Sequence, residues 1–287
     1  MTNNKTKGIF FIILSAFFFA LMNLFVRLSG DLPPMQKSFF RNLVALAFAV
    51  IVLLRTEEKF QFNRKNLPQL IARATFGTLG ILCNYYAIDH LVLSDASMLN
   101  KLSPFFAILV SYFYLKEKVT PVQISAVIIA FLGALCIIKP GFSSMNSFPA
   151  LIGALGGLGA GTAYTMVRKL SLNGERGPFI VFFFSAFSCL FCLPYLIFAY
   201  HPMTFQQLGF LLLAGLSAAG GQFSITAAYA NAPAREISVF DYSQIIFAAL
   251  FGFLFLQQIP DTLSVVGYLI ICGTSVAMFF YNQKHTS

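Results

Sequence analysis

The chain has 287 residues, of which 58% are hydrophobic and only 10% are charged. Soluble domains carry about 25% charged residues, so this composition excludes an ordinary soluble enzyme, a disordered chain and a disulfide-rich secreted domain. The formal net charge of +9 does not come from a dense Lys/Arg patch on a soluble module, which argues against a nucleic-acid partner. The class that remains is a polytopic membrane protein in contact with the lipid bilayer.

The sequence predicts ten membrane-spanning helices separated by short loops. A spanning helix needs about 20 mostly apolar residues. The apolar segments are continuous rather than alternating, which disfavours a β-barrel. Turn signals such as Pro33-Pro34 and Asn173-Gly174 lie near the predicted ends. The predicted helices are 7–28, 35–55, 69–90, 95–115, 120–138, 147–170, 178–200, 205–230, 235–256 and 262–281.

The placement of Lys and Arg predicts the orientation of these helices. With a cytoplasmic N-terminus, most of the 19 Lys and Arg residues fall on the cytoplasmic side, Arg73 among them. The outer side then holds Arg27, Lys37, Arg41 and Lys139, and Lys101 alone is left inside the membrane. We therefore expect a multi-pass protein of the plasma (inner) membrane with both termini in the cytoplasm.

An internal repeat follows from sliding the chain along itself by 141 residues. At this single offset Gly80 falls on Gly221 and Ser97 falls on Ser238, without a gap. Each copy holds five predicted helices, an odd number, so the second copy enters the membrane from the opposite side. The sequence thus predicts two inverted five-helix repeats, residues 1–141 and 142–287, an arrangement typical of secondary transporters.

Several segments resemble one known family. Asp95-Ala96-Ser97-Met98-Leu99, Pro104 and the run Tyr114 to Gln123 are similar to the helix 4–5 signature of EamA-type proteins in the drug/metabolite transporter superfamily. Asn84-Tyr85-Tyr86-Ala87 and Ala227-Ala228-Tyr229 also resemble that family. The second copy departs from the pattern, because Gln258 stands opposite Glu117 and Ile245 opposite Pro104.

The resemblance implies the same architecture that the repeat predicts, with cytoplasmic termini. It also implies a central cavity lined mainly by the first, third, fourth, sixth, eighth and ninth helices, and the export of amino acids or other small metabolites.

Polar side chains within the predicted spans are the candidate site residues, because a polar group in hydrocarbon needs a partner or a cavity. Matched positions of two inverted repeats meet at the centre, so matched polar stripes are candidate cavity linings. The alternative for each single Ser, Asn or Gln is a hydrogen bond between helices. The candidate substrate-binding residues are Asn23, Asn84, Tyr85, Ser97, Asn100, Lys101, Tyr164, Gln222, Ser238, Asp241, Tyr242 and Gln244.

Lys101 and Asp241 are the sharpest of these signals. At 1.5 Å per residue, Lys101 lies roughly 10 Å below the outer surface and Asp241 roughly 10 Å above the inner one, which leaves about 10 Å between their levels. Either the two residues form a structural pair, or Lys101 attracts a substrate carboxylate while Asp241 takes up a proton or a substrate amine. Asp241 is the candidate proton-coupling residue, because it is the only acid well inside a predicted span.

Other chemistries find little support. The run Gly156 to Gly161 lacks the spacing of a nucleotide-binding loop. Cys189 and Cys192 lie in a predicted span without His partners, so no metal or other cofactor is expected. The predicted function is a secondary active or facilitative transporter of a small polar or amphipathic metabolite, working by alternating access as a monomer or homodimer. The alternatives are a membrane-embedded lipid-modifying enzyme and a non-transporting scaffold.

Overall fold

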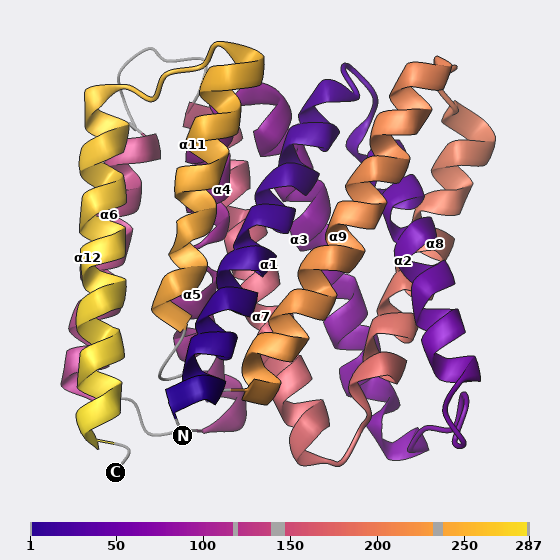
Figure 1. Ribbon diagram of the computed structural model, residues 1–287, viewed down its shortest axis with the longest axis horizontal. Coiled ribbons are helices and arrows are strands. Elements are labelled where there is room, and N and C mark those ends of the chain that lie inside the picture. The colour runs from indigo at the N-terminus through magenta and orange to yellow at the C-terminus, as the bar shows by residue number, and fades with distance from the viewer. Residues whose placement is uncertain (1, 117–119, 139–146, 232–237, 286–287) are drawn as a thin grey trace.

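The computed structural model describes residues 2–116, 120–138, 147–231 and 238–285. Within these ranges the chain forms helices, turns and short loops, without a strand. The helices stand side by side, and both chain termini lie at the same end of the bundle (Figure 1). We call this the termini end and the opposite one the far end.

The described helices make ten crossings of the bundle. Seven of them are long and apolar enough to span a membrane by themselves. The three others are α3, the broken crossing of α4, α5 and η2, and the crossing of η3 and α11. The elements are α1 (Thr2–Leu28), α2 (Pro34–Leu54), η1 (Arg64–Asn66), α3 (Leu67–His90), α4 (Leu93–Asn100), α5 (Ser103–Val110), η2 (Ser111–Leu115), α6 (Pro121–Ile138), α7 (Ser147–Leu172), α8 (Gly177–Ala199), α9 (Phe205–Asn231), η3 (Ser238–Tyr242), α11 (Ser243–Leu256) and α12 (Thr262–His285).

The same backbone features recur 141 residues apart. The fourth crossing ends at Lys116 and the ninth at Gln257, and both residues adopt a left-handed conformation with φ of 55° and 53°. Thr120 Oγ1 accepts from the Gln123 amide, and at the matching positions Asp261 Oδ1 accepts from the Ser264 amide. These are N-caps of α6 and α12.

The fold class predicted from the sequence is confirmed: an all-α membrane protein with ten transmembrane helices in two inverted five-helix repeats. α1 begins at the termini end, whereas its counterpart α7 begins at the far end (Figure 1). The predicted boundary between residues 141 and 142 lies outside the described residues.

The two repeats interleave. The most extensive contacts join α1 to α9 and α3 to α7, which are equivalent pairings. The remaining helices pair across the repeats as well: α2 with α8, α4 with α11, and α6 with α12. Across Figure 1 the pairs run from α6 and α12 on the left to α2 and α8 on the right. The centre of the bundle is therefore built from both copies at once.

The matched glycines lie at equivalent helix contacts. A Cβ on Gly80 would lie 3.0 Å from the backbone nitrogen of Ala160, so its absence lets α3 and α7 approach closely. A Cβ on Gly221 would lie 2.9 Å from the ring of Phe19, so its absence lets α9 and α1 approach closely in the same way.

One sequence prediction needs correction: the helix expected over 95–115 is broken. α4 ends at Asn100, and α5 begins at Ser103. Pro104 lacks the amide hydrogen that would bond to the Asn100 carbonyl, which favours the break. The crossing expected over 235–256 changes from a 3-10 helix to an α-helix between Tyr242 and Ser243, at the matching register. Ile245 stands there in place of proline, so the proline alone does not explain the shared break.

Candidate functional site

An ion pair joins the two helix breaks at the centre of the bundle. Lys101 Nζ donates to Asp241 Oδ2, and the two side chains are 11% and 21% exposed. Tyr242 Oη donates to the Lys101 carbonyl at 3.2 Å. The direct pair that the sequence left open is therefore present. A 3-10 helix rises about 2 Å per residue, more than an α-helix, which helps η3 to carry Asp241 toward the level of Lys101.

Several candidate site residues have a buried oxygen without a hydrogen-bond partner. Asn23 Nδ2 donates to Ser97 Oγ at 3.2 Å, but Asn23 Oδ1 is buried without a donor. Asp241 Oδ1 and Asn84 Oδ1 are also buried and accept no hydrogen bond. Leaving a buried oxygen unsatisfied costs about 1–3 kcal/mol, so such oxygens are typical of places where a ligand or water supplies the donor.

The other candidate residues lie at different depths of burial. Tyr85 is 1% exposed and its hydroxyl has no partner, and Gln244 is 6% exposed. Asn100 is half-buried, whereas the side chain of Gln222 is exposed. Ser238 begins η3, but its side chain lies outside the described part of the chain.

Tyr164 combines an exposed side chain with nearby charges from other helices. Its side chain is 58% exposed, which by itself would fit a lipid-facing position. However, Tyr164 is close enough to Arg41, Arg73 and Asp241 for their charges to act on it, and these residues come from α2, α3 and η3. Tyr164 is therefore an exposed residue of α7 that lies within electrostatic range of charges from three other elements.

Two arginines outside the predicted site have buried side-chain atoms. Arg41 was assigned to the outer side and Arg73 to the cytoplasmic side, with Lys101 as the one charge inside the membrane. In the structure Arg41 and Arg73 belong to α2 and α3, and the Nε atoms of both are buried. Arginine carries its charge at the end of a long flexible stem, so its position in the chain does not decide the level at which the guanidinium lies.

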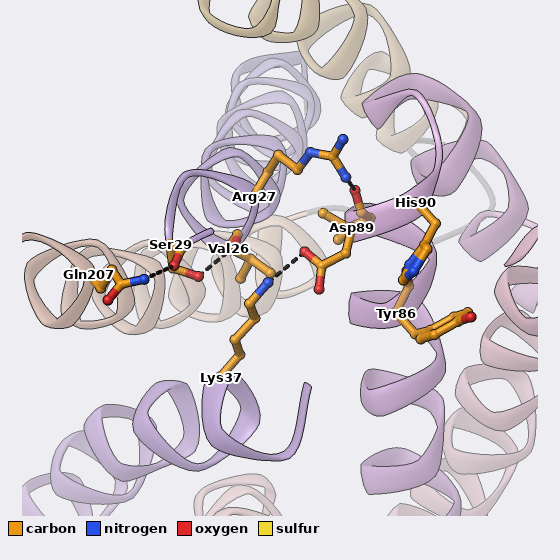
Figure 2. A network of polar contacts seen from close by, with 9 residues as sticks. Val26, Arg27, Ser29, Lys37, Tyr86, Asp89, His90 and Gln207 are labelled. Carbon is orange, nitrogen blue, oxygen red and sulfur yellow. Dashed lines mark hydrogen bonds and ion pairs between the residues drawn. The ribbon is translucent and has the colours of Figure 1, made fainter. Parts of the chain in front are cut away.

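The far end is closed by a second polar network, drawn in Figure 2. Lys37 Nζ donates to Asp89 Oδ1 at 2.5 Å, and the Lys37 side chain is fully buried. Arg27 donates to the carbonyl of Ile88 at 2.5 Å, and Gln207 donates to the carbonyl of Ser29 at 3.1 Å (Figure 2). These contacts tie α1, α2, α3 and α9 together.

The Lys37–Asp89 pair was not predicted from the sequence. The signal that could have found them is their position: Lys37 lies in the first turn of α2 and Asp89 in the last turn of α3. Successive antiparallel helices bring these two turns to the same end of the bundle.

The repeat symmetry is broken in the helix contacts. α3 contacts both α1 and α2, where the network of Figure 2 lies. The equivalent pairs, α9 with α7 and α9 with α8, make no contact of comparable extent within the described residues. In an inverted repeat, a contact between helices at one end of the bundle has its equivalent at the other end. At the termini end the described contacts are different ones: Glu175 accepts from Asn66, and Arg176 pairs with Glu58.

A helical bundle of two inverted, interleaved repeats, with broken helices and an ion pair between the breaks, is the architecture of a membrane transporter. The chain belongs to the EamA-like transporter family. The family model matches residues 6–139 and again residues 147–280, so the two matches begin 141 residues apart. The family moves small metabolites, and nothing in the match points to an enzyme.

Related proteins carry transporter names. The chain is 33% identical to a pseudopaline exporter of Pseudomonas aeruginosa, over 95% of each chain. It is 25% identical to solute carrier family 35 member G1 of Homo sapiens, over 94% of this chain and 78% of the other. A riboflavin transporter of Brucella anthropi is 24% identical over 90% and 93% of the two chains.

One solved structure, titled a crystal structure of protein, shares the fold with a TM-score of 0.67 at 12% identity. The match covers 98% of this chain and 99% of that one.

Proposed function

We propose that this protein exports a small, amino-acid-related metabolite from the cytoplasm across the plasma membrane by alternating access. The observation that carries the proposal is the Lys101–Asp241 pair, which joins the two helix breaks and remains partly accessible. Discontinuous helices commonly bind the substrate and coupling ion of secondary transporters. The 33% identity to an exporter supports the outward direction.

We propose further that the termini end faces the cytoplasm, as the excess of Lys and Arg near that end favours. We propose that the described conformation is inward-open, which the buried Lys37–Asp89 pair at the far end supports. The repeats 1–141 and 142–287 supply the two mirror-related gates.

Asp241 couples transport to protons in this proposal. When Asp241 is charged it holds Lys101, and one of its oxygens stays without a donor. Protonation removes the negative charge and releases Lys101, which then takes a carboxylate of the substrate together with Asn23 and Tyr242. Candidates of the wider lining are Asn84, Tyr85, Ser97, Asn100, Tyr164, Gln222, Ser238 and Gln244.

The test is flux through the purified protein in liposomes. A panel of labelled amino acids and amino-acid-derived metabolites is offered under an imposed pH gradient, with protein-free liposomes and a protonophore as controls. We expect saturable movement of at least one compound, which the protonophore reduces to the level of facilitated equilibration. Absence of flux for every compound of a broad metabolite panel would contradict the proposal.

A further inference from the structure

We propose that Arg41 and Arg73 form a binding site for a carboxylate of the transported metabolite, separate from the Lys101–Asp241 pair. The inference rests on the proposed function and adds a second point of attachment to it. The substrate class that follows is an organic acid with at least one carboxylate held by guanidinium groups.

Neither guanidinium has an acidic partner within the described residues. Arg41 donates to the amide oxygen of Asn42 at 2.7 Å, and Arg73 lies over the ring of Phe184, 4.0 Å from its centroid. The Nε atoms of both arginines are buried and without a hydrogen bond. Arginine does not lose its proton at physiological pH, so both positive charges persist inside the bundle.

The two arginines contrast with the lysines of the same helical bundle. Lys37 and Lys101 each have a carboxylate in direct contact. Removing a cation from water costs several kcal/mol, which a counter-charge normally offsets. Arg41 and Arg73 therefore lack a negative charge that an anionic ligand would supply.

The arginines converge on one place. Arg41 is close enough to Arg73 for their charges to repel each other, and it also acts on Tyr85 and Tyr164. The Tyr85 hydroxyl, on a side chain that is 1% exposed, has no partner in the structure. The two guanidiniums and the Tyr85 hydroxyl are thus a set of donors for which the described residues supply one side-chain acceptor, the amide oxygen of Asn42.

The backbone makes room for this arrangement. A Cβ built on Gly77 would lie 2.3 Å from Arg73 Nη1, so the guanidinium occupies space that only glycine leaves open. Side chains on a helix usually lean toward its N-terminus. Arg73 instead runs one turn toward the C-terminus of α3, away from the nearer membrane surface and toward the middle of the bundle.

A carboxylate fits this site because a guanidinium presents two parallel N–H groups to two oxygens. A metabolite held there by one acidic group can place a second polar group at Lys101 and Asp241. Its negative charge also screens the repulsion between the two arginines.

The test measures thermal unfolding of the full-length protein in detergent, titrated with citrate and, separately, with sodium chloride at equal ionic strength. We expect citrate to raise the unfolding temperature of the wild type beyond the salt control. R41Q and R73Q raise the half-saturating citrate concentration about tenfold or more, as loss of a hydrogen bond to a charged group predicts. R55Q removes the same charge from an exposed position after α2 and leaves the half-saturating concentration unchanged.

R73K is the control for misfolding of R73Q. It keeps the positive charge and loses only the paired N–H donors of the guanidinium. It should fold as the wild type does and bind citrate more weakly than the wild type. The inference is overturned if citrate does not stabilise the wild type, if R41Q and R73Q bind citrate as well as R55Q does, or if inorganic phosphate stabilises and citrate does not. Because the readout is binding, a protein that binds citrate normally but moves no metabolite refutes only the transport function.

Discussion

Two ion pairs join helices inside this protein, and they differ in the exposure of the lysine and in the neighbouring hydrogen bonds. At the far end Lys37 is fully buried and its partner Asp89 is 19% exposed, beside the Arg27 and Gln207 contacts. Lys101 and Asp241 are 11% and 21% exposed, and one Asp241 oxygen has no donor. A pair whose lysine is fully buried beside further contacts between helices serves to hold those helices together. A pair that is accessible and incompletely bonded can exchange its partner for a substrate or a proton.

Neutralising the acid of each pair should separate these roles in stability. Asp89→Asn leaves the fully buried Lys37 ammonium without a counter-charge, and we expect a loss of about 3–5 kcal/mol. Asp241→Asn should cost less than half of that, because water can reach Lys101. Thermal and denaturant unfolding in detergent measure both. Equal losses would remove the distinction between the pairs.

Replacing the whole far-end pair sharpens the comparison. Lys37→Met with Asp89→Asn removes both charges, and we expect most of the stability lost in Asp89→Asn to return. A double-mutant cycle should then give a coupling energy of about 0.5–3 kcal/mol between the two positions. A coupling energy near zero would mean that the pair contributes nothing to closing the far end.

The smallest effect is expected at the hydrogen bond that supports the central pair. Tyr242→Phe removes the donor to the Lys101 carbonyl and should lower stability by about 0.5–1.5 kcal/mol. Because Lys101 and Asp241 remain, the pH dependence of flux should stay as in the wild type. A variant of normal stability with altered pH dependence would instead place Tyr242 within the coupling mechanism.

The sequence predicted the ten helices and the repeat register because their signals are local. Apolar length sets each span, and one offset of 141 residues matches Gly80 with Gly221 in equivalent helix contacts. Gln258, a departure from the family pattern, keeps an acceptor oxygen: its Oε1 accepts from the Leu93 amide at 3.0 Å, at the start of α4. An amide can replace a carboxylate where only an acceptor is needed.

The interior charges could not be predicted in the same way. Arg73 lies near enough to one end of its helix to reach the membrane surface, and nothing local says that it turns inward. Its direction depends on Gly77 and on the Phe184 ring of another helix. The Lys37–Asp89 pair likewise depends on the packing of α2 against α3 at one end only. Such features follow from tertiary contacts between helices distant in sequence.

The most direct test of the account compares two kinds of flux through Asp241→Asn in liposomes. Counterflow exchanges labelled for unlabelled substrate without a net proton movement, whereas gradient-driven flux needs the coupling group. We predict that Asp241→Asn retains counterflow and loses pH-gradient-driven accumulation. If the variant accumulates substrate as the wild type does, Asp241 is not the coupling residue, and the proposed role of the central pair is wrong.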